Sequence, residues 1–463
     1  MQKTKMIFTI GPASESQEVL SKLIEAGMSV ARLNFSHSTH EEHKLKIDLI
    51  KKLRQKHNRH VAIMIDIKGP KIRTHNFKAD KVKLLKGSKF TIICGEEILG
   101  DETHCSISYS GLYKDVAVGN KILVDDGLLE LTVESIDGNK IHCIADNTSF
   151  IGNHKGVNVP SASINVPAVT DKDKEDLIFG CQMEVDMVAA SYIRKASDVL
   201  SVRKILDENG GEDIQVFSKI ESCEGIKNID KIIEASDGIM IARGDMGVEI
   251  PLEQVPLVQK MIIEKCNKAG KPVITATQML DSMIRNPRPT RAEVSDIVNA
   301  IFNGTDAIML SGESANGNYP IAAAQTMAKT AQAAEDKIDY VSWLNKNKKS
   351  CTADVSDAIS LSACIIAAEL NASAIITASA ENAASMLSKY RPKCPIISVI
   401  SNEKAARKAA LCWGVAALIS KPFSSTEELI TNCQKELLET GYVKKGDLIV
   451  VVAGVYLFAI FVE

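Results

Sequence analysis

Short apolar runs alternate with segments of helical periodicity along most of the chain. The runs are rich in Val, Ile and Met and lack polar alternation, which is typical of strands buried on both faces of a parallel sheet. Helical periodicity follows them, for example over 289–303 and 319–337. The first eight runs lie at residues 5–10, 29–35, 60–66, 186–191, 214–220, 238–243, 272–277 and 307–312.

Eight strand–helix units, without the interruption between the third and fourth runs, occupy roughly the 250 residues of a closed (β/α)8 TIM barrel. A doubly wound open sheet of the same size is the alternative. The chain contains neither G-x-G-x-x-G nor G-x-x-x-x-G-K-[ST], the usual nucleotide signatures of such sheets. The pattern therefore favours the α/β barrel.

The interruption, residues 71–167, has a different sequence pattern: short strand-like runs such as "KVKLLKGSKFTIIC" are separated by Gly-containing turns. It predicts a small all-β domain that overhangs the C-terminal face of the barrel as a lid. Beyond residue 345, the runs "AIITAS", "PIISVI", "GVAALI" and "DLIVVVAG" indicate a further α/β domain. We expect a catalytic barrel from 1–70 and 168–344, a β-barrel lid domain from 71–167, and a regulatory or oligomerisation domain from 345–463.

Composition narrows the class of protein. An apolar share of 45% and a charged share of 24% are ordinary for a globular protein, and a net charge of -3 argues against nucleic-acid binding. The eleven cysteines form no C-x-x-C pair, and the N-terminus does not resemble a secretory signal, so we expect reduced thiols and a cytoplasmic protein. The longest apolar stretch, 448–462, is too short to span a bilayer, and we expect no membrane partner.

Polar residues collect where the barrel strands should end. Lys219 and Glu221 are two residues apart, so they should project from the same side of their strand. Alone, such a pair is usually a solvated ion pair. Because strand ends converge at the mouth of a barrel, the collection favours a functional site. The residues expected there are Arg32, Asn34, Ser36, Asp66, Ser191, Lys219, Glu221, Arg243, Gly244, Asp245, Thr277, Ser311 and Glu313.

These residue types suggest phosphoryl chemistry. Glu221 and Asp245 suit a hard divalent cation such as Mg²⁺ or Mn²⁺, and Arg32 and Lys219 would neutralise phosphoryl oxygens. Phosphoryl transfer needs mainly positioning and charge stabilisation. The series His37, His40, His43 would suit zinc, but no Cys or carboxylate completes it and it opens a polar helix.

At these positions the chain resembles the pyruvate kinase family. The motifs, in order between residues 4 and 330, are "TIGPAS", "AGMSVARLNFSH", "IKGPKIRT", "KGVNVP", "SKIESCEG", "ARGDMGVEIP", "TATQML", "PTRAEVSD" and "MLSGES". The resemblance implies transfer of the phosphoryl group of phosphoenolpyruvate to ADP, giving pyruvate and ATP, the last step of glycolysis. It also implies a barrel with a β lid and a C-terminal α/β domain, assembled as a homotetramer.

The resemblance also implies roles for single residues. Catalysis would fall to Arg32, Lys219, Thr277 and Ser311, and Glu221 and Asp245 would hold Mg²⁺. The substrate would contact Arg32, Lys219, the backbone at Gly244 and Asp245, and Thr277. The nucleotide phosphates would face Asn34, Phe35, Ser36, His37, Arg73 and lid residue Lys155.

Many members of the family bind K⁺ with groups that match Asn34, Ser36, Asp66 and the carbonyl of Ile67. They carry Glu in the motif K-G-P-E-I-R, whereas this chain has "KGPKIR" with Lys71. An ammonium is a compact point charge that could occupy the potassium position and pair with Asp66. We therefore expect that K⁺ is not required, although Lys68 and Thr74 match the potassium-using pattern. The alternative is that Lys71 is an exposed lysine at a domain junction.

The C-terminal region departs from the family pattern. In "TASAENAASM" (377–386), Ala380 stands where Gly is usual and Glu381 adds a negative charge, so we expect weak or absent activation by fructose 1,6-bisphosphate. The segment "YLFAIFVE" (456–463) replaces the usual effector loop and last strand, and predicts an altered edge strand that could pair with another chain.

Two other functions remain possible from the sequence. Another Mg²⁺-enolate barrel, of the aldolase or phosphoenolpyruvate mutase type, would share Glu221 and Asp245 but should lack the lid with Lys155 and the segment "ARLNFSH". A non-catalytic sensor or scaffold would have lost polar groups at the strand ends, and all of them are present.

Overall fold

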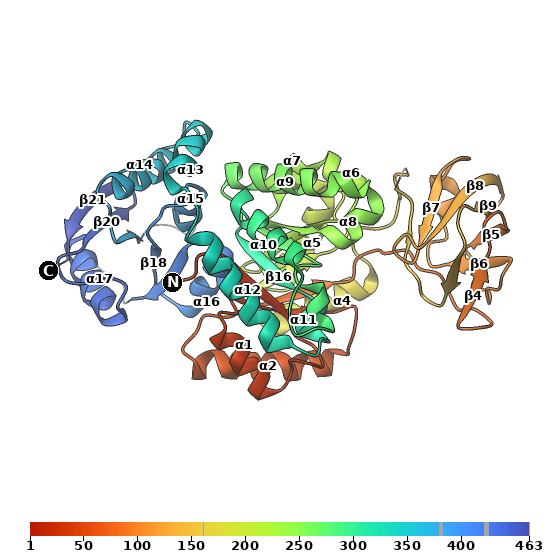
Figure 1. Cartoon of the computed structure of the whole chain (residues 1–463), viewed down its shortest axis with the longest axis horizontal. Coiled ribbons are helices and arrows are strands. Elements are labelled where there is room, and N and C mark those ends of the chain that lie inside the picture. The colour runs from red at the N-terminus through yellow and green to blue at the C-terminus, as the bar shows by residue number, and fades with distance from the viewer. Residues whose placement is uncertain (161, 379–382, 421–425, 463) are drawn as a thin grey trace.

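The computed structural model has three parts in a row, with the barrel in the middle (Figure 1). It describes residues 1–160, 162–378, 383–420 and 426–462. The β domain lies at one end of the molecule and the C-terminal domain at the other, on opposite sides of the barrel (Figure 1). Ala380 and Glu381, on which the expectation about fructose 1,6-bisphosphate rests, lie outside the described residues.

The eight predicted strands close into a parallel barrel in the order β1-β16-β15-β14-β13-β12-β3-β2. This confirms the (β/α)8 prediction over an open sheet. The strands are β1 (Lys5–Thr9), β2 (Val30–Asn34), β3 (Ala62–Ile67), β12 (Met187–Ala190), β13 (Gln215–Ile220), β14 (Gly238–Ala242), β15 (Val273–Ala276) and β16 (Ala307–Leu310).

Apolar side chains fill the barrel interior and its outer wall. Phe217 lies in the interior, and a Cβ on Gly238 would come within 2.3 Å of its ring, so only glycine fits beside it. The helices around the barrel are α1 (Gln17–Glu25), α2 (His40–Lys56), α4 (Asp171–Gln182), α5 (Ala196–Asp207), α6 (Cys223–Lys227), α7 (Ile229–Ala235), α8 (Arg243–Glu249), α9 (Val255–Ala269), α10 (Arg291–Asn303), α11 (Gly312–Ala315) and α12 (Pro320–Glu335), with 3-10 turns η1 (Leu252–Gln254) and η2 (Asp281–Ile284).

The inserted domain is almost entirely strand and has its own apolar core, as predicted. Its ladders form a six-stranded sheet, β11-β7-β8-β9-β5-β6, and a separate pair, β10-β4. Its elements are β4 (Lys81–Leu84), β5 (Lys89–Cys94), β6 (His104–Ile107), α3 (Leu112–Asp115), β7 (Lys121–Val124), β8 (Leu129–Asp137), β9 (Lys140–Ala145), β10 (Ser149–Gly152) and β11 (Val157–Asn158).

The C-terminal domain is a five-stranded sheet in the order β19-β18-β17-β20-β21 with helices packed on it. Buried Arg391 joins it to the barrel through Asp306 at 2.7 Å and the Gly304 carbonyl at 2.6 Å. Its elements are α13 (Tyr340–Asn347), η3 (Lys348–Ser350), α14 (Val355–Glu369), β17 (Ala374–Thr377), α15 (Ala383–Lys389), β18 (Ile396–Ile400), α16 (Glu403–Lys408), η4 (Ala409–Leu411), β19 (Val415–Ile419), α17 (Thr426–Thr440), β20 (Leu448–Ala453) and β21 (Tyr456–Phe461).

The divergent segment after residue 455 forms β21, which runs antiparallel to β20 at the edge of this sheet. Tyr456 and Phe461 are 62% and 68% exposed at its two ends. Within the described ranges, no helix combines the length and the apolar character needed to cross a bilayer.

Candidate active site at the mouth of the barrel

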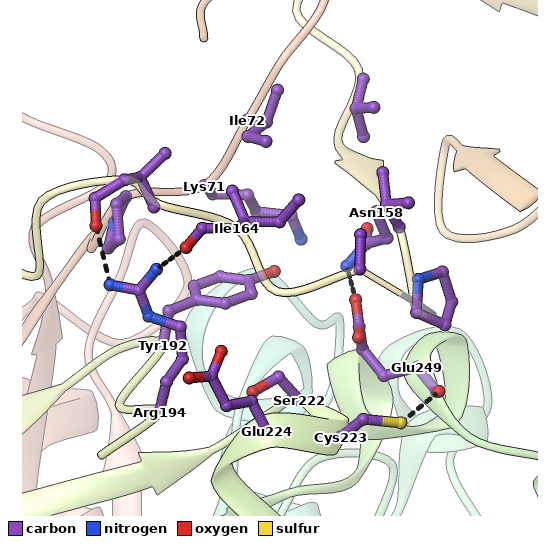
Figure 2. Close-up of a pocket in the computed structure, with 16 residues that line it drawn as sticks. Lys71, Ile72, Asn158, Ile164, Tyr192, Arg194, Ser222, Cys223, Glu224 and Glu249 are labelled. Atoms are coloured by element: carbon purple, nitrogen blue, oxygen red, sulfur yellow. Dashed lines mark hydrogen bonds between the residues drawn. The ribbon is translucent and has the colours of Figure 1, made fainter. Parts of the chain in front are cut away.

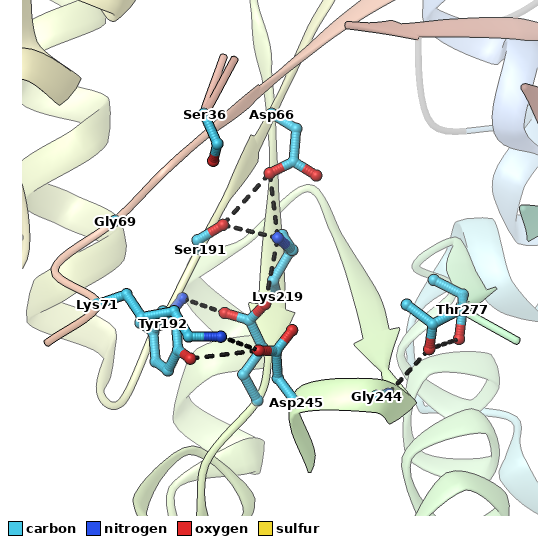
Figure 3. Close-up of polar contacts among 12 residues, drawn as sticks. Ser36, Asp66, Gly69, Lys71, Ser191, Tyr192, Lys219, Gly244, Asp245 and Thr277 are labelled. Carbon is cyan, nitrogen blue, oxygen red and sulfur yellow. Dashed lines mark hydrogen bonds and ion pairs between the residues drawn. The ribbon is translucent and has the colours of Figure 1, made fainter. Parts of the chain in front are cut away.

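Lys219 lies at the centre of the polar cluster, near the end of β13 (Figure 3). Its ammonium contacts Asp66 Oδ1 at 3.1 Å, Ser191 Oγ at 2.7 Å and Glu221 Oε1 at 3.1 Å. The predicted alignment of Lys219 and Glu221 on one side of the strand is confirmed. Because these groups come from the ends of three neighbouring strands, closure of the barrel builds the cluster.

Arg32, on β2, is fixed beside this cluster by two contacts. Its Nε donates to Asp66 Oδ2 at 2.7 Å, and one terminal nitrogen donates to Thr9 Oγ1 at 2.8 Å. Asp66 therefore holds Arg32 with one oxygen and Lys219 with the other. The two cations lie side by side in fixed positions at the mouth, an arrangement that suits a polyanionic ligand.

The ionisation of this cluster follows from its charges. Burial lowers the pKa of Lys219, but the carboxylates of Asp66 and Glu221 outweigh burial and hold that pKa above its ordinary value. Burial raises the pKa of Asp66, but Arg32 and Lys219 outweigh it and hold that pKa below its ordinary value. Lys219 therefore stays charged, and Asp66 stays ionised, across the neutral range.

Two carboxylates, Glu221 and Asp245, lie at the adjoining ends of β13 and β14. Burial, together with the neighbouring Asp245 charge, raises the pKa of Glu221 despite the contact with Lys219. Burial also acts on Asp245, but the ammonium of Lys71 at 2.7 Å holds its pKa below the ordinary value. Two carboxylates that repel each other in a partly buried pocket fit a divalent cation that completes its shell with water and substrate oxygens.

Tyr192 is a member of this site that the sequence analysis missed. Its backbone N–H donates to Glu221 Oε2 at 2.6 Å, and its hydroxyl lies 3.3 Å from Asp245 Oδ1. Its φ of +55 places the backbone in the left-handed region, which a residue other than glycine rarely adopts. The available signal was its position directly after the fourth strand, next to Ser191.

Thr277 follows β15 and has a φ of +67, a strained conformation for a β-branched residue. Its Oγ1 accepts from the Gly244 N–H at 2.9 Å and donates to the Ala276 carbonyl at 2.6 Å. Arg243 supports this turn, because it donates to the Thr277 carbonyl at 2.6 Å while bound to Asp296. Arg243, one of the expected strand-end groups, thus positions Thr277.

Ser311 follows β16 and forms the eighth corner of the mouth. Its hydroxyl is buried, and it has no hydrogen-bond partner among the residues that the structure describes. Its neighbour Glu313 is 2% exposed and accepts from the Ser311 and Leu280 N–H groups at 2.8 and 2.9 Å. Glu313 therefore links the segments that follow β15 and β16 through their backbone N–H groups. The Ser311 hydroxyl takes part in none of these hydrogen bonds.

The segment after β2 contributes mainly backbone and small polar groups. Asn34 Oδ1 accepts from the Ser36 N–H at 3.1 Å, and His37 is exposed. The side chain of Phe35 is 1% exposed and stacks on His43 at 4.0 Å between ring centroids, so only its backbone could reach a nucleotide. The Ile67 side chain is likewise buried, which leaves only its backbone for a cation.

The three histidines do not converge on a metal. His43 Nε2 lies 2.9 Å from the His37 carbonyl, and His40 Nε2 lies 2.7 Å from Asp176. No group of three or more metal-ligating side chains occurs within the part of the chain that the structure describes. The spacing of His37, His40 and His43 therefore reflects the packing of α2, in which His40 contacts Asp176 and His43 contacts Phe35.

Arg73 and Lys155 lie on the two segments that connect barrel and lid. These segments pair, since the Thr74 N–H donates to the Lys155 carbonyl at 2.9 Å. Arg73 donates to the His154 carbonyl at 2.9 Å, and Lys155 forms an ion pair with Asp125 at 2.9 Å. The structure thus brings Arg73 and Lys155 together at the base of the lid.

The predicted ion pair between Lys71 and Asp66 is wrong for this structure. Lys71 pairs with Asp245 at 2.7 Å and lies 3.8 Å from Asp126. The reason is that both oxygens of Asp66 are already held by Arg32 and Lys219 in a buried position. Asp245 is less enclosed and has an oxygen within reach of Lys71 (Figure 3).

The fold and the site together define a class, a (β/α)8-barrel phosphotransferase with an inserted β domain and a C-terminal α/β domain. Two family models match this chain: "Pyruvate kinase, barrel domain" over residues 1–324 and "Pyruvate kinase, alpha/beta domain" over residues 357–458. The chain belongs to the pyruvate kinase family.

Individual relatives extend over nearly the whole chain. The chain is 63% identical to a pyruvate kinase of Clostridium acetobutylicum, over 98% of this chain and 96% of the relative. It is 56% identical to a pyruvate kinase of Clostridium perfringens, with the same coverage. A solved pyruvate kinase from Cryptosporidium parvum superimposes with a TM-score of 0.97 at 38% identity, over 100% of this chain and 96% of the other.

Proposed function

We propose that this chain transfers the phosphoryl group of phosphoenolpyruvate to ADP, giving pyruvate and ATP, with the groups at the barrel mouth as its active site. The observation that carries the assignment of the site is Lys219, a partly buried ammonium fixed by Asp66, Ser191 and Glu221 beside Arg32. Pyruvate formation from phosphoenolpyruvate and ADP, coupled to lactate dehydrogenase, tests the activity. No pyruvate above the rate without enzyme would refute it and leave the aldolase-type or scaffold functions.

Arg32 and Lys219 would bind and transfer the phosphoryl group. The planar guanidinium of Arg32 is anchored on Asp66 and Thr9, so it can present its remaining donors to phosphate oxygens. Lys219 would stabilise the charge on the phosphoryl group between donor and acceptor. A preorganised cation of this kind acts where charge develops and needs no rearrangement during the reaction.

Members of the family generally need a divalent cation, and we propose Mg²⁺ or Mn²⁺ held by Glu221 and Asp245. Bound there, the cation would supply positive charge for the enolate and carboxylate oxygens of the substrate. Tyr192 would keep both carboxylates in place, Glu221 through its backbone N–H and Asp245 through its hydroxyl. The matching test is loss of Mn²⁺ binding in Asp245→Asn.

The far side of the mouth would hold the substrate carboxylate and supply the proton. The backbone at Gly244 and Asp245 would receive the carboxylate, for which the Gly244 N–H would exchange its present partner, Thr277 Oγ1. Thr277 and the Ser311 hydroxyl, which has no hydrogen-bond partner among the described residues, would then bind the water that carries a proton to the enolate. Solvent-isotope exchange into pyruvate, measured for Ser311→Ala, tests this route.

ADP would lie between the β2 loop and the lid. Asn34, the Phe35 backbone, Ser36 and His37 would face its phosphates from the barrel. Arg73 and Lys155 would face them from the base of the lid. Lys155 would leave Asp125, a pair that is partly exposed and therefore weak. A raised KM for ADP in Lys155→Met, with the KM for phosphoenolpyruvate unchanged, is the expected result.

We propose that the ammonium of Lys71 replaces K⁺, although its resting partner is Asp245 and not Asp66. Its ammonium rests at Asp245 after β14, whereas the proposed potassium groups Asn34, Ser36, Asp66 and the Ile67 carbonyl lie at or just after the ends of β2 and β3. Once substrate is bound, its phosphate would draw the flexible side chain toward those groups, because lysine carries its charge on a four-carbon stem.

We propose that the catalytic barrel comprises 1–70 and 168–344, the lid 71–167 and the C-terminal domain 345–463. The end of β3 at Ile67 and the beginning of α4 at Asp171 support the first two boundaries. We propose a cytoplasmic homotetramer. The free state of all eleven cysteines, none of which falls in an undescribed range, is consistent with a reducing compartment. Light scattering that gives the mass of one or two chains would contradict the tetramer.

A further inference from the structure

Lys71 occupies the proposed metal site through one oxygen of Asp245. Its Nζ lies 2.7 Å from Asp245 Oδ1, the same oxygen that the Tyr192 hydroxyl reaches at 3.3 Å. Its ammonium also lies 5.8 Å from the centre of the Tyr192 ring. Lys71 is therefore a protein cation seated on a carboxylate that the proposed function assigns to a divalent cation.

The backbone places Lys71 where the lid joins the barrel. The chain turns at Gly69, whose φ is +68 and whose Cβ would come within 2.8 Å of the Ser191 carbonyl, so this turn is held against the barrel. On the returning segment, a Cβ on Gly156 would lie 2.8 Å from Lys71 Cε. The lysine stem thus packs against the returning segment.

Asp126 gives the ammonium a second carboxylate, on the lid. It lies 3.8 Å from Lys71 Nζ, in the turn between β7 and β8. The next residue of this turn, Gly127, faces Val248 on α8, where an added Cβ would be 3.9 Å away. Lys71 therefore lies between a barrel carboxylate and a lid carboxylate.

The shift that Lys71 needs to reach Asp126 is short, and the lysine also borders an open space. A cavity of about 70 Å³ opens beside it between the connecting segments and the barrel loops (Figure 2). It is bounded by Ile72, Asn158, Tyr192, Cys223 and Glu249, among others. The ammonium on Oδ1 neutralises part of the Asp245 charge and repels a divalent cation bound to the same carboxylate, so the two cations compete for Asp245.

We infer that Lys71 is a built-in counter-ion that competes with the divalent cation at Asp245 and moves toward lid residue Asp126 when the cation binds. This inference rests on the proposed metal site at Glu221 and Asp245. It means that the enzyme without substrate holds its metal more weakly than two carboxylates alone would. It also means that metal loading and the contact between lid and barrel are one coupled equilibrium.

Mn²⁺ binding to the protein without substrate, followed by electron paramagnetic resonance of the free ion, tests this without an activity readout. In Lys71→Met the affinity for Mn²⁺ should rise about tenfold, within the 5–150-fold range usual for coupled sites. Lys78→Met removes a lid lysine whose partner is Asp101 at 2.7 Å, and should leave binding unchanged.

The role of Asp126 is tested by a double-mutant cycle. Asp126→Asn should weaken Mn²⁺ binding in the wild-type background by about two- to threefold, because the displaced ammonium loses its second carboxylate. In the Lys71→Met background the same change should have no effect. An equal effect of Asp126→Asn in both backgrounds would overturn the movement toward the lid.

The remaining outcomes separate this inference from the metal site itself. If Asp245→Asn abolishes the Mn²⁺ site but Lys71→Met leaves its affinity unchanged or weaker, the competition is refuted and the metal site stands. If Asp245→Asn does not alter Mn²⁺ binding, the metal site and the inference both fail. Circular dichroism and thermal melting establish that each variant is folded.

Discussion

Replacing Lys219 by Met removes the central cation of the mouth while keeping an unbranched side chain of similar length. Three contacts disappear, to Asp66, Ser191 and Glu221. Two consequences follow from the structure, one on the rate and one on stability. The two effects can be measured separately, because the loss of rate depends on the substrate in the transition state and the loss of stability depends on the carboxylates that Lys219 contacts.

The loss of rate is set by the transition state. A preorganised donor aimed at developing charge is worth about 10²–10³ in kcat, or about 2.7–4 kcal/mol. The neighbouring Arg32 remains bound to Asp66, so substrate binding should survive better than turnover. We expect kcat to fall by at least about 10² while the KM for phosphoenolpyruvate changes only a few-fold.

The loss of stability comes from the carboxylates that remain. Breaking a buried ion pair costs about 3–5 kcal/mol when the other charge stays buried. Asp66 keeps Arg32 at 2.7 Å, and Glu221 keeps the Tyr192 N–H at 2.6 Å, so the cost should lie at the lower end of that range. The variant should therefore fold, with a lower melting temperature.

Lys389→Met is the matched control. Lys389 is 2% exposed at its side chain and pairs with fully buried Asp357 at 2.8 Å, but it lies in the C-terminal domain. Its loss should lower the melting temperature by a similar amount and leave kcat almost unchanged. Pyruvate formation and thermal melting are measured on both variants. A Lys219→Met enzyme within threefold of the wild-type kcat would refute the assignment, as would an equal loss of kcat in Lys389→Met.

Three further predictions concern pH and ligands. Burial lowers the pKa of Lys5, which donates to the Val415 carbonyl, to about 8. The unfolded chain therefore binds more protons between pH 8 and about 10.5, and stability should rise with pH there by up to about 1.4 kcal/mol per unit. Urea unfolding should show that Lys5→Met lacks this rise; an equal rise in both proteins would contradict the buried charge. Added KCl at constant ionic strength should change kcat/KM by less than about tenfold, or 1.4 kcal/mol, whereas Lys71→Glu should acquire a potassium requirement. Without that requirement, Lys71 is no substitute for K⁺. Fructose 1,6-bisphosphate should leave the substrate affinity unchanged; a saturable shift at micromolar concentration would show that Ala380 and Glu381 do not block the effector.

Local pattern alone was sufficient to predict the barrel and the contact between Lys219 and Glu221. Continuous apolar runs followed by helical periodicity predicted all eight barrel strands. A strand that is covered on both faces is apolar along most of its length and does not alternate with polar residues. The two-residue spacing of Lys219 and Glu221 predicted their contact, because side-chain direction alternates along a strand. The convergence of strand ends then placed Arg32 and Asp66 beside them.

Only the tertiary structure decided which oxygen each cation reaches. Lys71 and Asp245 are 174 residues apart, and their contact exists because Asp66 is already saturated and because the lid connection turns at Gly69. Tyr192 contacts both carboxylates from a backbone in the left-handed conformation. The hydrophobic periodicity of the sequence does not predict this conformation. A strand can be predicted from residues that are close in the sequence. The ion-pair partner of a long, flexible side chain such as Lys71 depends instead on which carboxylates distant residues have already bound.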